Sequence, residues 1–180
     1  MKISRRKTLV IIIVVIVLAI LFKTTLQIFP VIGDSMEPGL QWGQQLLTNK
    51  TAYHFHEPER GDVIILRPPF NPEVGFIKRL IAVPGDTVEV KDGAVYINGL
   101  KLSEPYIKEP PTYTFPPQKI PDDEYFVLGD NRNDAFDSHV GWTAPRQDII
   151  GKVWLSVWPP GQWEVVSHYP LQEQLVSPAE

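Results

Sequence analysis

Two residues with the side chains of a protease dyad stand in unusual local sequences. Ser35 lies in residues 33–38, which read Gly-Asp-Ser-Met-Glu-Pro, between a glycine-bearing turn and a proline. Lys78 lies inside an apolar stretch, where strand alternation places it on one face with Phe76 and Leu80. A serine hydroxyl becomes a nucleophile when a neighbouring base removes its proton, and a neutral lysine can be that base. The two residues therefore form a candidate Ser/Lys catalytic pair.

The pKa of Lys78 decides whether it can act as a base. A free lysine has a pKa near 10.4, so only about one side chain in 250 is neutral at pH 8. Burial of Lys78 among its apolar strand neighbours would lower this pKa, because a charged amine is costly out of water. The alternative is that Lys78 and Arg79 are exposed charges on an edge strand, where they discourage pairing with other sheets. The residues themselves leave both interpretations open.

The other polar clusters are weaker candidates for chemistry. Residues 137–139 read Asp-Ser-His, but immediate neighbours cannot point at one another in triad geometry. A triad of Ser35 with a distant histidine stays open, although nothing in the sequence favours it. Residues 54–57 place two histidines beside a glutamate, but no further ligand is evident, which favours solvated loop residues over a metal site. Cysteine is absent, and we predict neither a metal nor a cofactor.

Short strands joined by turns must position the candidate pair. The 18 prolines and 12 glycines of the 180-residue chain favour a β-rich fold with many turns. Apolar or alternating stretches typical of strands occur at residues 62–66, 76–83, 87–90, 94–97, 125–128 and 149–158. The third and fourth of these flank Lys91-Asp92-Gly93 and are expected to form a hairpin. The predicted fold is mainly β, with a folded sheet or partly closed barrel.

The N-terminus has the pattern of a membrane anchor. Four basic residues within residues 1–7 precede an apolar run, and a helix over residues 8–29 would reach about 33 Å, enough to span a bilayer. No Ala-x-Ala cleavage pattern follows, which favours an uncleaved anchor over a removed export signal. A buried soluble helix is disfavoured because residues 9–22 have no polar face. The positive-inside rule places residues 1–7 in the cytoplasm and residues 30–166 outside it.

The remaining composition limits the partners and the end of the chain. The net charge of −4 and the lack of a dense basic run beyond the N-terminus argue against binding of nucleic acid. Residues 104–123 hold six prolines and are expected to form an extended excursion. Residues 167–180 are polar, and we expect this tail to fray.

Four stretches in the same order resemble the motifs of the type I signal peptidase family. They are residues 33–38 around Ser35, residues 60–64, residues 77–86 around Lys78, and residues 129–132 followed by Asp137 and Ser138. The Asp-Ser-His ending is similar to that of signal peptidases from cyanobacteria and plastids. The combination of all four with an N-terminal anchor is specific, and the resemblance covers roughly residues 7–160.

The resemblance implies a function. Ser35 would be the nucleophile and Lys78 the base, with no metal or cofactor, and backbone N–H groups near Ser35 would hold the oxyanion. Asp130, Arg132 and Asp137 would mainly brace the neighbouring loop. The fold would be a signal-peptidase-like folded sheet in residues 30–166, with an excursion at about 88–124.

The same resemblance implies the partners and the location. The substrates would be preproteins that carry signal peptides, with small side chains at the first and third positions before the cut, bound extended by strand addition. The protein would be a monomer that contacts membrane lipid. It would cross the cell or thylakoid membrane once, with its catalytic domain on the periplasmic or lumenal side.

Three positions depart from the family, and two rival functions remain. Gly39 stands where a threonine is usual, Gly33 where some members have a serine, and Ala135 where a serine usually bonds the lysine. One rival is a self-cleaving repressor-type Ser/Lys protease, which would carry a DNA-binding domain in place of an anchor. The other is an inactive membrane-tethered β-domain that binds preproteins or assembly partners.

Overall fold

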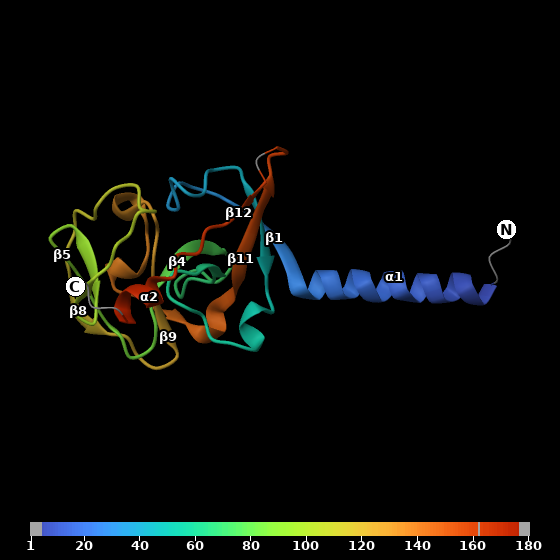
Figure 1. Ribbon diagram of the computed structural model, residues 1–180, viewed down its shortest axis with the longest axis horizontal. Coiled ribbons are helices and arrows are strands. Elements are labelled where there is room, and N and C mark those ends of the chain that lie inside the picture. The colour runs from blue at the N-terminus through green and yellow to red at the C-terminus, as the bar shows by residue number, and fades with distance from the viewer. Residues whose placement is uncertain (1–4, 162, 177–180) are drawn as a thin grey trace.

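A long helix projects from a β-rich domain (Figure 1). The computed structural model describes residues 5–161 and 163–176. Residues 1–4 of the predicted cytoplasmic tail and residues 177–180 of the predicted polar tail lie outside this range. The arrangement confirms the predicted mainly-β fold with one N-terminal apolar helix.

The helix, α1 (Arg5–Thr25), ends earlier than predicted. Residues 6–25 are long and apolar enough to cross a membrane, and none of the most apolar window is buried against the domain. The predicted helix over residues 8–29 is wrong at its end, because Leu26–Pro30 form strand β1. The carbonyl of Thr25 accepts a hydrogen bond from the Lys50 N–H at 2.8 Å, so pairing with the neighbouring strand replaces the next helical turn. Twenty residues still give about 30 Å of helix.

The main sheet has eight antiparallel strands. Its path runs through β1, β2 (Gln45–Asn49), β11 (Ile149–Trp158), β3 (Val63–Leu66), β4 (Phe76–Ala82), β9 (Glu124–Leu128) and β10 (Ala144–Pro145), and β12 (Glu164–Val165) pairs with β11. The two end strands, β1 and β10, do not pair with each other. The sheet is therefore open, in line with the predicted partly closed form.

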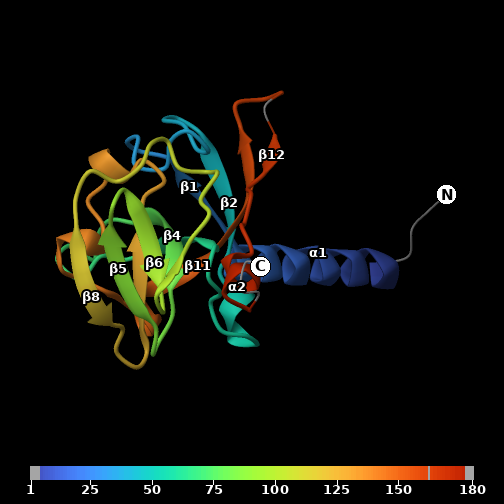
Figure 2. The ribbon, with the colours of Figure 1, turned by 60° about the vertical axis from the view of Figure 1, so that its left-hand side comes forward.

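A second, four-stranded sheet lies at the end of the domain farthest from α1 (Figures 1 and 2). Its order is β7 (Leu100–Lys101), β6 (Ala94–Ile97), β5 (Thr87–Lys91) and β8 (Phe115–Lys119). The predicted hairpin is confirmed by the β5–β6 pairing, which includes Val88 with Ile97. Its turn takes positive φ at Asp92 and Gly93, as a two-residue hairpin turn requires. Short 3₁₀ turns occupy Ala52–His54, Arg132–Asp134, Ser138–Val140 and Arg146–Asp148.

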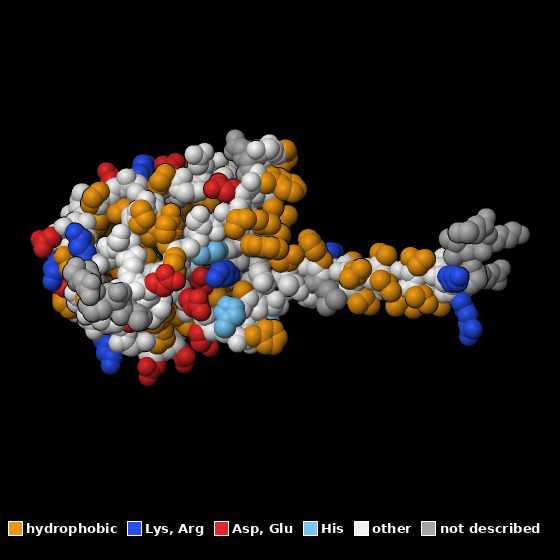
Figure 3. Space-filling model, viewed as in Figure 1, with side chains coloured by type: hydrophobic (Ala, Val, Ile, Leu, Met, Phe, Trp, Pro, Cys, Tyr) orange, Lys and Arg blue, Asp and Glu red, His pale blue; other side chains and the backbone are white. Residues whose placement is uncertain are grey.

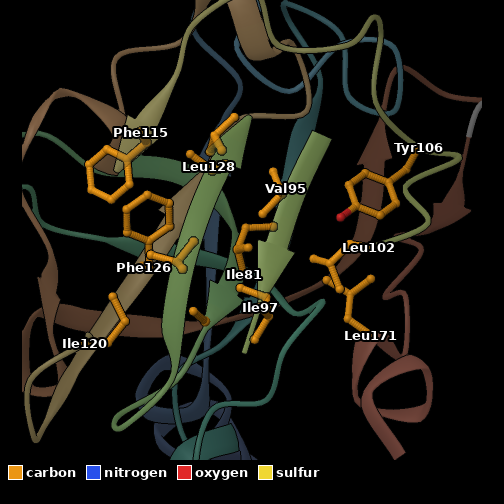
Figure 4. Close-up of a cluster of buried hydrophobic side chains, with 13 residues drawn as sticks. Ile81, Val95, Ile97, Leu102, Tyr106, Phe115, Ile120, Phe126, Leu128 and Leu171 are labelled. Atoms are coloured by element: carbon orange, nitrogen blue, oxygen red, sulfur yellow. The ribbon is translucent and has the colours of Figure 1, made fainter. Parts of the chain in front are cut away.

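One hydrophobic cluster joins the two sheets (Figure 4). Ile81 and Phe126 come from the main sheet, and Val95 and Ile97 come from the small one. Leu171 also belongs to the cluster; it begins a short helix, α2 (Leu171–Val176), and its side chain is fully buried. The sheets therefore share one core, which the C-terminal segment completes.

The described part of the C-terminal tail is ordered against the domain. We name residues 164–176 the C-terminal strap. Gln174 donates to the carbonyl of Ser103 and accepts from its N–H, as a strand partner would. The expectation of a fraying tail is wrong for these residues, because Leu171 buries its side chain and Gln174 satisfies backbone groups.

We predict that Leu171→Ala lowers the free energy of unfolding by about 2–5 kcal/mol, because it leaves a cavity in the shared core. Leu100→Ala is the matched control: Leu100 is 42% exposed, so its loss should cost within about 0.5 kcal/mol. Urea unfolding of the full chain in detergent measures both variants. Equal effects would show that the strap does not contribute to the folded core.

Candidate active site

Ser35 and Lys78 line the same cavity, which has a volume of about 530 Å³. Ser35 lies in the loop that follows β1, and Lys78 lies in the middle of β4. Phe76 and Phe136 add aromatic walls, and Ile32 adds an apolar rim. Residues 43 positions apart in the sequence are thus brought to one concave surface, as a Ser/Lys pair requires.

The loop that carries Ser35 is shaped by its own backbone. Gly33 has φ of +94°, a conformation that side chains rarely adopt, so glycine suits this turn. The Glu37 N–H donates to the carbonyl of Asp34, and Met36 anchors the loop with a side chain that is 2% exposed. Among the described residues, the N–H groups of Ser35 and Met36 have no protein acceptor. These two donors are therefore available to a bound oxyanion.

Lys78 is buried in an interior strand. β4 pairs with β3 on one side and β9 on the other, and both Lys78 and Arg79 are 3% exposed. The alternative of exposed edge-strand charges is therefore wrong. The Nζ atom of Lys78 lies 5.4 Å from the centroid of the Phe76 ring, and no residue in the described chain forms a hydrogen bond or ion pair with it.

Burial lowers the pKa of Lys78 to about 8, and the negative charges of Asp137 and Asp130 oppose this shift. At pH 8 about half of the amines are then neutral, compared with about one in 250 for a free lysine. The apolar strand context of Lys78 thus produces the protonation state that a general base needs.

Arg79, the next residue, is equally buried, but its side chain has hydrogen-bond and ion-pair partners. Its guanidinium forms two hydrogen bonds to the carboxylate of Asp130, at 2.9 and 2.7 Å. A third bond runs to the carbonyl of Gly61 at 2.9 Å. The planar guanidinium binds both oxygens of the carboxylate, so it fixes the position of Asp130.

The loop of Asp130 contacts the backbone of Ser35 directly. The Asn131 N–H donates to the carbonyl of Ser35 at 3.0 Å, and the Asn131 side chain donates to the carbonyl of Asp34 at 3.2 Å. A side chain on Gly129 would collide with the same Ser35 carbonyl and with Ala135. Only glycine allows this close approach, so the loop acts as a template for the position of Ser35.

Arg132 and Asp137 hold the same loop from the other side. Arg132 is fully buried and pairs with the carboxylate of Glu104 at 2.6 and 2.8 Å. Asp137 accepts a hydrogen bond from the Gly129 N–H at 2.8 Å and contacts His139 Nδ1 at 2.6 Å. Sequence reasoning missed Glu104, because nothing in the neighbouring residues of the chain marks it as the partner of a buried arginine.

Neither the Asp-Ser-His stretch at residues 137–139 nor the histidines at residues 54 and 56 form a second site in the part of the chain that the structure describes. The Ser138 hydroxyl accepts a hydrogen bond from the Val127 N–H, so it serves the backbone rather than a triad. His54 and His56 are exposed, and within residues 5–161 and 163–176 no three His, Asp or Glu side chains gather as ligands for a metal. Ala135, where the resembling family has a serine, is buried and packs beside Gly129.

Comparisons with known proteins identify the family of this chain. The family model described as signal peptidase, peptidase S26, matches residues 4–158. A probable signal peptidase I-1 of Synechocystis sp. is 47% identical over 137 residues, which are 72% of this chain and 70% of that protein. The chloroplastic thylakoidal processing peptidase 1 of Arabidopsis thaliana is 37% identical over 82% of this chain and 46% of that protein. A crystal structure of a signal peptidase I from Enterococcus faecalis, 34% identical, matches with a TM-score of 0.49 over 53% of this chain and 96% of that chain.

The family match begins one residue before α1 and ends at the last residue of β11, so it includes both Ser35 and Lys78. It spans far more than half of the chain, and the Synechocystis relative is well above 30% identical over more than two thirds of it. The chain belongs to the signal peptidase family, peptidase S26.

Proposed function

We propose that this chain is a membrane-bound serine endopeptidase that removes N-terminal signal peptides from exported preproteins, with Ser35 as nucleophile and Lys78 as general base. The observation that carries the proposal is the buried, unpaired amine of Lys78 in the cavity that Ser35 also lines. Relatives named signal peptidase I and thylakoidal processing peptidase support the reaction and the substrate class.

The reaction follows from these groups. Neutral Lys78 accepts the proton of the Ser35 hydroxyl as Oγ attacks the scissile carbonyl. The N–H groups of Ser35 and Met36, which have no protein acceptor among the described residues, can donate to the developing oxyanion. Protonated Lys78 then gives its proton to the leaving amine, and the signal peptide stays on Ser35 as an ester. A water molecule, deprotonated by Lys78, hydrolyses the ester and releases the serine.

The cavity also offers a place for an extended substrate. Ile32 lines it, is 77% exposed, and has no backbone hydrogen bond among the described residues. A substrate backbone can therefore pair with this segment by strand addition. The apolar walls suit the short uncharged side chains expected before the cut.

Membrane lipid is the second proposed partner. Hydrophobic side chains gather on the end of the domain from which α1 leaves (Figure 3). Exposed members on β1, β11 and β12 include Ile28, Trp154, Trp158 and Val165. Tryptophan favours the lipid–water interface, so this surface supports a domain apposed to the membrane that α1 crosses once. One copy of the chain carries both Ser35 and Lys78, so a monomer suffices.

Replacement of either member of the pair should remove nearly all cleavage. Ser35→Ala loses the nucleophile and Lys78→Met loses the base, and the double variant should be no worse than either, because the two act as a unit. Lys78→Met should keep or raise Tm, because it removes an unpaired buried charge. Lys101→Met, at an exposed lysine, is the control and should cleave normally. Wild-type turnover by Lys78→Met on a preprotein would refute the mechanism.

The pH dependence should report Lys78. The neutral amine is the active form, so the single-turnover rate should rise about tenfold per pH unit below the pKa of Lys78 and reach a plateau above it. The midpoint is expected near pH 8, where burial places this pKa. Rates on one peptide substrate in detergent measure the profile. A midpoint above pH 10 would mean that Lys78 is solvated in the active protein.

The topology should place the cavity outside the cytoplasm. The four basic residues within residues 1–7 favour the cytoplasmic side, so residues 31–180 lie across the membrane from it. Protease added to the cytoplasmic side of sealed vesicles should leave this domain intact. Digestion with the vesicles still sealed would invert the orientation.

A further inference from the structure

The ring of His168 bridges two strands of the main sheet. Its Nδ1 accepts a hydrogen bond from the Val63 N–H at 3.0 Å, and its Nε2 lies 2.9 Å from the carbonyl oxygen of Val153. A backbone N–H can only donate and a carbonyl can only accept. Nδ1 must therefore be bare and Nε2 must carry the hydrogen, so this geometry requires the neutral ring.

The ring takes the place of one missing backbone pair, or rung, between strands β3 and β11. β3 and β11 pair through Ile64 and Lys152, but the ladder does not continue to Val63 and Val153. His168 inserts between those two residues and satisfies both backbone groups. A protonated ring would turn Nδ1 into a second donor facing the Val63 N–H, and this rung would be lost.

The rung holds the C-terminal strap against the candidate active site. The carbonyl of Ser167, the residue before His168, accepts a hydrogen bond from Arg79 at 3.1 Å. Tyr169, the residue after it, lies with its ring centroid 5.2 Å from the Arg79 guanidinium. Arg79 binds Asp130 on its other side.

The path from the strap ends at the nucleophile. Asp130 belongs to the loop whose next residue, Asn131, donates to the carbonyl of Ser35. Each step is a direct contact between named groups: Ser167 with Arg79, Arg79 with Asp130, and Asn131 with Ser35. The strap is therefore one support of the loop that positions Ser35.

We propose that His168 is a positioning residue: its neutral imidazole holds the C-terminal strap on β3 and β11, and through Arg79 and the loop of Asp130 it keeps Ser35 in place, whereas protonation of the ring releases the strap. The consequence for catalysis rests on the proposed function. The consequence for the strap does not, since it concerns only the contacts of the ring.

The charged groups around the ring favour the neutral form. Asp62 Oδ1 lies 3.7 Å from Nδ1 and attracts a proton, but Lys152 binds that carboxylate at 2.5 Å and offsets its charge. Arg79 adds a further positive charge. Burial, and then the charge of Lys152, lower the pKa of His168 from its ordinary value. The side chain is still 24% exposed, so protons reach it from solvent.

The sign of the pH effect follows from this lowered pKa. The folded strap binds fewer protons than the released strap between the lowered pKa and about 6.5, the usual value for histidine. The attachment of the strap through His168, which we call the latch, is therefore fully formed above about pH 6.5. It weakens as the pH falls from about 6.5 to the lowered pKa of the folded state.

The matched variants are His168→Gln and His168→Ala. A glutamine amide offers one acceptor and one donor but cannot titrate, so His168→Gln should retain most of the wild-type rate at pH 8. His168→Ala loses both bonds and should be at least tenfold slower. His54→Gln removes an exposed histidine and should match the wild type throughout.

The pH–rate profile separates positioning from bulk stability. Protonation of Lys78 alone gives a slope of about one in log rate against pH. The wild-type slope should steepen toward about two on the acid side, where His168 also titrates, while His168→Gln should keep a slope of about one. Parallel profiles for the wild type and His168→Gln would overturn the role in catalysis.

Hydrogen exchange tests the strap without any substrate. In the full chain in detergent, protection of the Val63 and Val166 amides and of the rest of the strap should fall on acidification in the wild type. Comparison with His168→Gln at the same pH removes the pH dependence of exchange itself, and that variant should stay protected. Equal protection of both proteins at pH 5 would overturn the latch. If the wild type never cleaved a preprotein yet showed this difference in protection, the proposed function alone would fail.

Discussion

The unpaired burial of Lys78 is the constraint on which the candidate site depends. Among the described residues three cations are buried, and the two arginines each have a carboxylate partner, whereas Lys78 has none. A buried ion without a partner is costly, so the free energy of this site favours loss of the proton. Arg79 and Arg132 hold the surrounding loop through their carboxylate partners. The two arginine–carboxylate pairs thus maintain the shape of the site, and the amine of Lys78 is left to gain and lose a proton during the reaction.

Part of this site could be predicted from the sequence. Lys78 stood out because a lysine inside an apolar strand is unusual, whereas the serine in its turn became a strong candidate through the resemblance of both stretches to family motifs. Strand alternation could not decide whether Lys78 was buried, because that depends on β3 and β9 covering both edges of its strand. Arg79 illustrates the same limit, since its partner Asp130 lies 51 residues away.

The two incorrect predictions about the fold, the end of the N-terminal helix and the fraying tail, have a common cause. Residues 26–29 are apolar enough for either a helix or a strand, and the ladder with β2 decides between them. The tail after residue 166 is rich in polar side chains, yet Leu171, His168 and Gln174 attach it to distant parts of the chain. In both segments the deciding contacts are long-range, and local periodicity carries no information about them.

The direct junction between α1 and β1 links the protein to the thickness of its membrane. No linker separates them: β1 begins at the residue after α1 and pairs with β2 along all five of its residues. A helix in a bilayer thinner or thicker than its apolar length responds by tilting or by deforming the lipid. With such a junction, a tilt of the helix also tilts the sheet and the cavity next to it. In the proposed membrane-spanning arrangement, bilayer thickness would set the orientation of the sheet and of the cavity relative to the membrane surface, through lipids that never touch Ser35.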